Sequence, residues 1–315
     1  MIEVNILYRK YSEYLKEKYG EKIYKLPINL PITCPNRIDG KGCSFCADVG
    51  TGFEAMDSCN SVTEQMHKTK ELICRKYKAK KFIAYFQNYT NTFMPLDRFK
   101  AYMHEAAKDQ DIVEISISTR PDCIREDYLV VLNEIHDQYG VDINIELGLQ
   151  TVNYHTLDQI NRGHSLAEFL DAVMRIKKYP FTICTHIILN LPQDTMRDVI
   201  ETAKILSALQ IDIVKLHSLY IAKNTELARQ YKEGLIEICS KEEYISRVAT
   251  FIEYVSPDMV IERLFSRVPE ENSDFSNWGT SWWKLQDELM QKMTDEDIYQ
   301  GKKYNYLNGR ALDKL

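Results

Sequence analysis

The chain of 315 residues is long enough for one large domain, and its 44% hydrophobic content suffices for a sizeable core. Its formal net charge of -6 disfavours a protein that coats a nucleic acid through many phosphate contacts. No apolar run approaches the roughly 18 residues that span a bilayer, and the charged amino terminus lacks a signal peptide's apolar region. We therefore expect a cytoplasmic protein with no membrane partner.

Short β-branched runs alternate along the chain with segments of helical periodicity. After an N-terminal helical extension (1–24), the predicted strands are residues 25–32, 81–86, 113–119, 143–149, 182–189, 212–216 and 259–264. Capping boxes predict helix starts at 61–64, 165–168 and 240–243. This alternation predicts parallel strands joined by right-handed crossovers. We expect an α/β fold, a partial or full (β/α) barrel over residues 25–268, followed by a C-terminal cap segment (269–315).

Polar residues recur on one face of two predicted strands, because side chains alternate between the faces of a strand. They are Glu114, Ser116 and Ser118 on the third strand, and Asn144 and Glu146 on the fourth. An ordinary barrel interior is packed with aliphatic residues, so a polar interior indicates a ligand-filled cavity. The alternative is the exposed face of an open sheet. Polar residues also gather where strands end, the edge at which active sites of such folds lie.

Three cysteines lie in one loop after the first predicted strand, in the stretch TCPNRIDGKGCSFC: Cys34, Cys43 and Cys46. Three thiolates suit zinc or an iron–sulfur cluster, but structural zinc usually takes two ligand pairs and only one C-x2-C is present. Among the scattered cysteines, we interpret Cys74 and Cys184 as small buried hydrophobic residues. Cys59 is an alternative fourth ligand. With three cysteines, a cubane cluster leaves one iron open to a ligand from outside the protein.

The loop resembles that of radical S-adenosylmethionine (SAM) enzymes of the YhcC/YtqA type, which read TCPNR, a Gly-rich stretch and then CxFC. Most radical SAM enzymes space these cysteines C-x3-C-x2-C with an aromatic residue before the last. Here Phe45 supplies the aromatic residue, but the first gap is eight residues. STRPD (118–122), ELGLQT (146–151) and INRGH (160–164) fit the same branch, and the resemblance covers nearly the whole chain. It extends more weakly to the radical-SAM half of the Elongator catalytic subunit.

The resemblance implies a 4Fe-4S cluster held by the three loop cysteines, which cleaves SAM reductively to a 5′-deoxyadenosyl radical. It also implies an electron donor such as flavodoxin or ferredoxin. Phe45 would contact the adenine, Gln150 the ribose and Arg162 the methionine carboxylate. The usual Gly-Gly-Glu motif is absent, and YFQNYTN stands in its place. Gln87 or Asn88 would therefore bind the methionine amine, helped by an inward-pointing Glu146.

Lys215 and His217 are the candidate catalytic residues on the substrate side, with a structural role as the alternative for His217. The resemblance points to transfer RNA, and to conversion of the wobble uridine's carboxymethylaminomethyl group to aminomethyl. Basic stretches at 75–81 and 301–310 would hold phosphates, unless they are solvated surface. Aromatic residues of 277–284 would stack on a base or pack as core. Two alternatives are a radical SAM enzyme for a small molecule or protein, and a non-catalytic iron–sulfur or zinc module.

Overall fold

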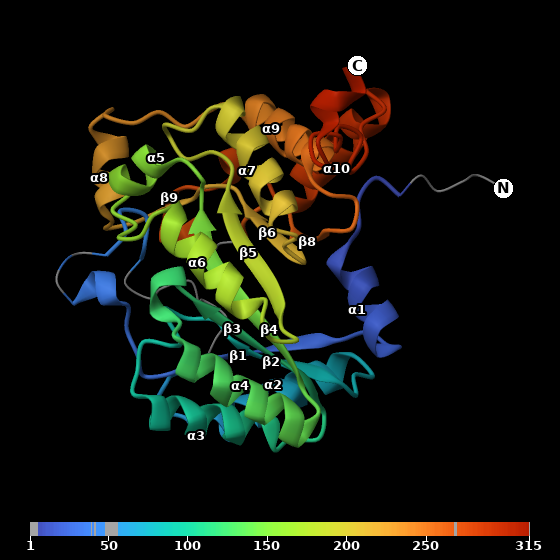
Figure 1. Ribbon diagram of the computed structural model, residues 1–315. Coiled ribbons are helices and arrows are strands. Elements are labelled where there is room, and N and C mark those ends of the chain that lie inside the picture. Colours follow the sequence, from blue (N-terminus) through green and yellow to red (C-terminus); the bar gives the residue numbers. More distant parts are fainter. Residues whose placement is uncertain (1–5, 39, 41, 48–55, 268–269, 315) are drawn as a thin grey trace. The chain divides into compact units, whose positions relative to one another are not determined.

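The computed structural model describes residues 6–38, 40, 42–47, 56–267 and 270–314. Its helices are α1 (Tyr11–Tyr19), α2 (Val62–Lys76), α3 (Leu96–Ala107), α4 (Glu126–Tyr139), α5 (Tyr154–Gln159), α6 (Leu166–Ile176), α7 (Met196–Ala208), α8 (Glu226–Lys232), α9 (Lys241–Tyr254) and α10 (Trp282–Asp295) (Figure 1). Its strands are β1 (Tyr24–Ile28), β2 (Phe82–Phe86), β3 (Ile112–Thr119), β4 (Asp142–Gln150), β5 (Thr182–Ile188), β6 (Ile213–His217), β7 (Ile221–Ala222), β8 (Val260–Arg263) and β9 (Ser273–Phe275). Within these ranges, no helix is both long and apolar enough to cross a membrane.

Seven strands form one sheet in the order β1-β2-β3-β4-β5-β6-β8, while β7 and β9 form a separate antiparallel pair. Strands β1 to β4 pair in parallel, as do β6 and β8. This order and the intervening helices confirm the expected (β/α) barrel in its partial form. Each of the seven predicted strands overlaps an observed one. The first was predicted too long, because β1 ends at Ile28 and Pro31 has no N–H to give to a ladder.

The helix starts follow the predicted caps. Ser61 before α2 and Ser165 before α6 each form the full capping box, with Glu64 and Glu168 as partners. Ser240 caps α9 by accepting the N–H of Glu243 at 3.1 Å. These hydroxyl groups satisfy N–H groups that have no partner inside their helices. Local sequence therefore sets where these three helices begin.

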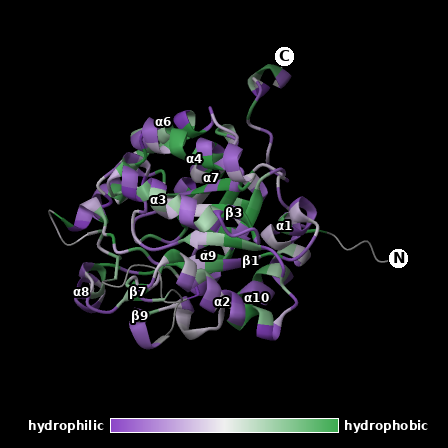
Figure 2. Cartoon of the chain, turned by 90° about the horizontal axis from the view of Figure 1, so that it is seen from below, coloured by the Kyte–Doolittle hydropathy of each residue, from purple (hydrophilic) through white to green (hydrophobic). Residues whose placement is uncertain are grey.

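The chain forms two compact units. The cysteine unit comprises residues 12–149 and 161–185, and the C-terminal unit comprises residues up to 11, 150–160 and from 186 onward. In the cysteine unit, helices α2, α3 and α4 lie together on one face of β1 to β3 (Figure 1). Figure 2 shows the hydrophobic colouring of β3 beside the more hydrophilic colouring of α3. The sheet thus supplies the core and the helices supply the outer surface.

The other face of β3 and β4 is polar, yet it is also buried. The residues that the alternation places there are between 0 and 9% exposed: Glu114, Ser116, Ser118, Asn144 and Glu146. Ser116 donates to Glu114 at 2.8 Å, and Asn144 donates to Ser116 at 3.1 Å across the two strands. The interior face is therefore polar, as expected, and the alternative of a solvent-exposed open face is wrong.

In the C-terminal unit, the segment 277–284 is half-buried on average, and Trp278 packs against core aromatic residues. Trp278 packs its ring 5.2 Å from that of Tyr244 and 5.5 Å from that of Phe275, and its indole N–H donates to the Cys239 carbonyl oxygen at 2.8 Å. Trp283 is different, since its side chain remains 55% exposed. Of the two expectations for these aromatic residues, core packing holds for Trp278.

Candidate metal and cofactor site

The three loop cysteines lie together after β1. We call residues 34–46 the cysteine loop. The N–H of Arg37 donates to the Cys34 carbonyl oxygen at 2.9 Å, and that of Cys46 donates to the Cys43 carbonyl oxygen at 3.0 Å, so each half of the loop closes a tight turn. Burial raises the pKa of the Cys46 thiol to about 11, and the neighbouring Cys43 and Cys34 thiols add to the rise. The structure thus gathers three thiols that are 12 residues apart at most in sequence.

A second loop of the same unit, residues 161–164, braces the cysteine loop, and we call it the clamp loop. Nδ2 of Asn36 donates to the carbonyl oxygens of Asn161 and Arg162 at 2.7 and 3.0 Å. In return, Nδ2 of Asn161 donates to the Gly42 carbonyl oxygen at 2.8 Å. These bonds join segments about 120 residues apart in sequence, and they belong to the TCPNR and INRGH motifs.

The close approach of the two loops explains a glycine. Gly163 has φ of +73°, and a Cβ atom there would lie 2.2 Å from Oδ1 of Asn36 and 3.1 Å from Nη2 of Arg120. Only glycine fits both the backbone angle and the space. Arg120, which follows β3, is 3% exposed; its Nη1 donates to the Arg162 carbonyl oxygen at 2.8 Å and lies 3.9 Å from Cys34 Sγ.

Arg162 reaches the thiols from the clamp loop. Its Nη1 lies 3.5 Å from Cys43 Sγ, and its Nη2 donates to the Gly148 carbonyl oxygen at 2.6 Å. Its Nε is buried and has no hydrogen-bond partner among the described residues. A buried N–H without a partner is rare in native proteins, and it marks a place where a ligand atom would be accommodated. N–H donors thus face two of the three thiols, Cys34 and Cys43, an arrangement that fits a thiolate-bound, anionic metal cluster.

Of the remaining cysteines, Cys123 rather than Cys59 lies near the cysteine loop. Cys59 is exposed, with Sγ 3.8 Å from Nδ2 of its neighbour Asn60. Cys123, just beyond β3, is half-buried, and burial, Asp122 and the Cys34 thiol raise the pKa of its thiol to about 12. Cys123 is thus a fourth thiol close to the cysteine loop, on the side of Cys34. The prediction of burial is confirmed for Cys184, but Cys74 is exposed because it lies on the outer face of α2.

Of the two residues after β2 that were expected to bind the methionine amine, Asn88 has an acceptor atom that is free among the described residues. Asn88 is 3% exposed; its Nδ2 donates to Asn29 at 2.8 Å, while its Oδ1 has no hydrogen-bond partner in the described part of the chain. Such an acceptor suits an amine donor. Gln87 is half-buried, and its N–H donates to the Ile28 carbonyl oxygen at 3.4 Å. Phe45, also half-buried, sits in the turn between the last two loop cysteines.

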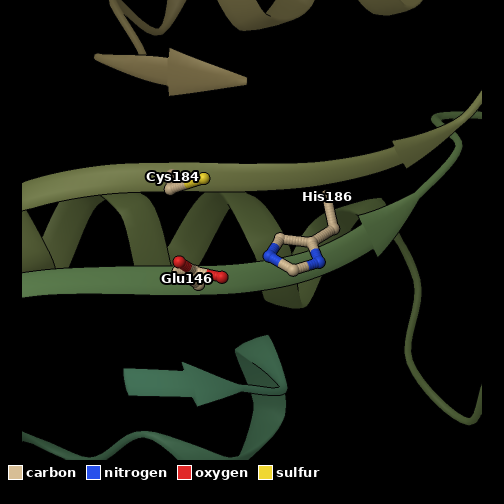
Figure 3. Close-up of side chains that lie close together, drawn as sticks. All are labelled: Glu146, Cys184 and His186. Atoms are coloured by element: carbon tan, nitrogen blue, oxygen red, sulfur yellow. The ribbon is translucent and has the colours of Figure 1, made fainter. Parts of the chain in front are cut away.

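Glu146 and Gln150 lie on β4. Glu146 is buried and is held by Lys25 Nζ and by the Tyr85 hydroxyl, each at 3.0 Å. One of its carboxylate oxygens lies within 4.8 Å of Cys184 Sγ, and Figure 3 shows Cys184 and His186 on the neighbouring strand β5. Gln150 ends β4 with φ of +80°, an angle that costs energy for a residue other than glycine. Strain of this kind concentrates at ligand sites.

The predicted catalytic pair lies in the C-terminal unit. Lys215 on β6 is 2% exposed, and its Nζ lies 3.2 Å from the Glu262 carboxylate on β8. The imidazole of His217 stacks on that of His186 at 5.3 Å. The lysine charge is therefore compensated by a carboxylate within the protein.

The two basic stretches lie at the edge where strands begin, not where they end. Residues 75–81 join α2 to the start of β2, whereas the cysteine loop follows the end of β1. In 301–310, Lys303 bonds to Glu253 and Tyr306 to Tyr254, at the end of the helix that precedes β8. Within its own unit, each stretch is thus set apart from the predicted site residues. Phosphate contacts by these stretches stay a prediction, and they would have to be made away from the predicted site residues of each unit.

The sequence profile of the Radical SAM superfamily matches residues 28–206, and that of the Radical_SAM C-terminal domain matches residues 211–295. The uncharacterized protein YtqA of Bacillus subtilis is 32% identical over 304 residues, covering 95% of this chain and 94% of its own. Protein YhcC of Escherichia coli is 29% identical over 287 residues, covering 90% and 91%. The archaeal Elp3 structure from Methanocaldococcus infernus has a similar fold, with a TM-score of 0.67 at 17% identity. That likeness covers 88% of this chain and 64% of the Elp3 chain, so the chain spans less than two thirds of it.

Proposed function

The chain belongs to the radical SAM superfamily, and we propose that it modifies transfer RNA, converting the wobble uridine's carboxymethylaminomethyl group to aminomethyl. The superfamily's cofactors are a 4Fe-4S cluster and SAM. Once bound and reduced, they would supply a 5′-deoxyadenosyl radical that removes a hydrogen atom from the methylene of the substrate's carboxymethyl group. Loss of one electron from the resulting radical to the oxidised cluster would give an imine, and water would hydrolyse its C=N bond to release the two-carbon group as glyoxylate and leave the aminomethyl amine. The residues of the chain hold the cofactors, orient the substrate and exclude competing reactions.

The observation that carries the enzymatic part is the gathering of three thiols after β1, two of which face N–H donors. In this proposal Cys34, Cys43 and Cys46 bind three irons, and the fourth iron is left for SAM. The Arg162 guanidinium orients the methionine carboxylate through its partnerless Nε. Asn88 Oδ1 accepts from the methionine amine, in place of the missing Gly-Gly-Glu motif.

Other residues position the nucleoside part of SAM. Phe45 holds the adenine through its ring and backbone, and Gln150 contacts the ribose from its strained position at the end of β4. Glu146, Lys25 and Tyr85 form a charge-compensated set that keeps the interior face of β4 polar and ordered.

Two features support an RNA base as substrate. The first is the resemblance of the motifs to the Elongator catalytic subunit, together with the likeness of fold to the archaeal Elp3. The second is the buried polar interior of β3 and β4, which suits a polar substrate. A wobble base is already unstacked in the anticodon loop, which lowers the cost of bringing it to a radical inside a barrel. Recognition of one presented base also agrees with a net charge of -6.

On the substrate side, Lys215 holds the carboxylate of the uridine side chain and His217 contacts the base. Binding would require Lys215 to exchange its contact with Glu262 for the substrate carboxylate. Lys215→Met should therefore weaken substrate binding while leaving iron content and SAM affinity unchanged.

The test is incubation of the reconstituted enzyme, a reductant and SAM with transfer RNA that carries the carboxymethylaminomethyl group. Mass spectrometry of the nucleosides should show its loss and the matching gain of the aminomethyl nucleoside, together with 5′-deoxyadenosine. The control is the enzyme with Cys34→Ala. An unchanged nucleoside, beside deoxyadenosine formation that depends on some other substrate, would reject the RNA assignment and keep the radical SAM one.

One observation favours a second candidate, a small-molecule substrate. Both basic stretches lie at the strand edge away from the predicted site residues of their units. A small polar substrate needs no such surface. Binding of unmodified transfer RNA separates the candidates, because an RNA enzyme should bind it with an affinity that falls as salt rises.

A further inference from the structure

We propose that Asn36 and Arg120 are positioning residues that donate N–H groups to the cluster thiolates and thereby raise the cluster's reduction potential. The proposal rests on the assignment of the three loop cysteines as iron ligands. It concerns side chains that bind no iron and contact the ligand sulfurs.

Asn36 is oriented by the clamp loop. Its Nδ2 lies 3.5 Å from Cys43 Sγ and also contacts the carbonyl oxygens of Asn161 and Arg162. Carbonyl oxygens have no hydrogen to give, so this end of the side chain must be the NH2 group. Its other end, Oδ1, faces Gly163, where there is no room for a Cβ atom. The two carbonyl oxygens thus fix the orientation of the amide, and the two hydrogens of its NH2 group are shared among these oxygens and Cys43 Sγ.

Arg120 is oriented by a carboxylate. Its Nε and Nη2 bond to the two Asp122 oxygens at 2.9 and 2.7 Å, which leaves Nη1 for the Arg162 carbonyl oxygen and, at 3.9 Å, for Cys34 Sγ. The guanidinium is 3% exposed, so water screens its field little. Asn36 and Arg120 therefore approach two different ligand sulfurs from two different elements.

The expected effect follows from charge. Reduction adds one electron to a cluster that already carries thiolates. Hydrogen bonds to the sulfurs and a nearby positive charge stabilise the added charge, and both are known means by which proteins set such potentials. Loss of either donor should make the reduced form less favourable without removing a ligand.

The chain offers a matched control. Arg125 repeats the Arg-x-Asp pattern with Asp127, through bonds of 3.2 and 2.7 Å from Nε and Nη2. The Arg125 side chain is 71% exposed, and no bond from it to a thiol is present in the described residues. Comparison of Arg120→Met with Arg125→Met therefore separates an effect on the cluster from the general effect of breaking such a pair.

The experiment uses the full chain, reconstituted anaerobically with iron and sulfide and without SAM. Iron and sulfide content, melting temperature and the potential from an electrochemical titration read by electron paramagnetic resonance (EPR) are measured for Asn36→Leu, Arg120→Met, Arg120→Lys and Arg125→Met. We expect wild-type iron in all four. The equilibrium constant for reduction should fall about tenfold in Asn36→Leu and Arg120→Met, equal to about 59 mV for one electron. The equilibrium constant should fall less in Arg120→Lys, and it should not change in Arg125→Met.

Wild-type potentials in fully loaded Asn36→Leu and Arg120→Met would overturn the proposal. Loss of iron from both would overturn it too, because the residues would then only brace the loop. Where Arg120→Met does not fold, Arg120→Lys carries the test. A wild-type protein that takes up no cluster would instead contradict the proposed function, so failure of this proposal and failure of the proposed function are distinguishable.

Discussion

Both ends of β3 and β4 carry polar groups, but those groups are used differently. At the end where the strands begin, four side chains form what we call the basal cluster: Lys18, Tyr19, Glu114 and Asp142. The Tyr19 hydroxyl lies 2.9 Å from Glu114 and 2.8 Å from Asp142, and Lys18 Nζ lies 2.9 Å from Asp142. Donors and acceptors face one another there, so the cluster joins α1 to the sheet.

At the other end, where the strands finish, polar groups face thiols or have no protein partner. Nη1 of Arg162 and Nδ2 of Asn36 face Cys43 Sγ, while Nε of Arg162 and Oδ1 of Asn88 have no hydrogen-bond partner in the described residues. Buried polar groups are normally satisfied, so such exceptions indicate a place for a ligand. The difference teaches that burial and polarity alone do not identify the site. Unsatisfied atoms alone do not either, since Asn144 Oδ1 near the start of β4 also lacks a partner within the part of the chain that the structure describes; Arg162 is distinctive because it has an unsatisfied N–H and also faces a thiol.

The largest expected effect comes from the loop cysteines. Replacing Cys34, Cys43 or Cys46 by Ala removes one iron ligand, so each variant should lose most of its iron and form no 5′-deoxyadenosine. Iron analysis after anaerobic reconstitution checks this. Cys59→Ala, at an exposed thiol, is the control, and it should keep both its iron and its formation of 5′-deoxyadenosine. Full activity in any one of the three loop variants would contradict the ligand assignment.

Next in size is Arg162. Losing a charge-assisted pair with a buried carboxylate costs about 2 to 5 kcal/mol, which is roughly 30-fold or more in affinity. Arg162→Ala should weaken SAM binding by at least this factor, and calorimetric titration measures it. Arg125→Ala on the exposed pair should bind as the wild type does. Equal affinity of Arg162→Ala and wild type would show that the guanidinium serves the loop and not SAM.

The two ends should also respond to pH in opposite directions. At the cysteine end, burial and the Arg162 charge lower the pKa of His164 to about 4, below its unfolded value of about 6.5. The neutral ring therefore contributes stability that is present above about pH 6.5 and is lost as pH falls toward 4. The loss should be about 3 kcal/mol, and His164→Gln should remove this slope from the free energy of unfolding. A variant with the wild-type slope would contradict this origin.

At the basal cluster, burial raises the pKa of Glu114 above its unfolded value of about 4.3. Its bound proton contributes stability that is complete below about pH 4.3 and is lost as pH rises through the folded pKa. Glu114→Gln should therefore flatten this decline, as followed by urea unfolding across pH. Glu17→Gln, at an exposed position of α1, should leave the slope unchanged. We expect this effect to be the smallest, because Lys18 and Ser116 offset part of the rise.

Local patterns predicted the framework and the gathering of the three loop thiols. The period of two in β3 and β4 predicted the polar interior, and hydroxyl–carboxylate spacing predicted the helix starts. The cysteine spacing predicted which thiols gather. These features depend on residues that are close in sequence, so the sequence alone contains them.

The contacts that complete the candidate site were not predictable in this way. Asn36 meets Arg162 across 126 positions, and Arg120 meets Cys34 across 86 positions. Only the fold brings these pairs together. The motifs TCPNR, STRPD and INRGH had singled out the segments, but not the side chains that bridge them. The prediction that Cys74 is buried was wrong for a related reason, since helical periodicity does not say which face of α2 meets the sheet.

The most direct test of the account is the EPR spectrum of the reduced, reconstituted wild type with and without SAM. Three protein ligands and one open iron predict about four irons per chain and a spectrum that changes when SAM is added. The same change should occur in Cys123→Ala, whose thiol lies beside the loop but is not a ligand in this account. The contrary result is a spectrum that SAM does not change in the wild type but does change in Cys123→Ala. It would mean four protein ligands and would contradict the open iron on which the proposed function depends.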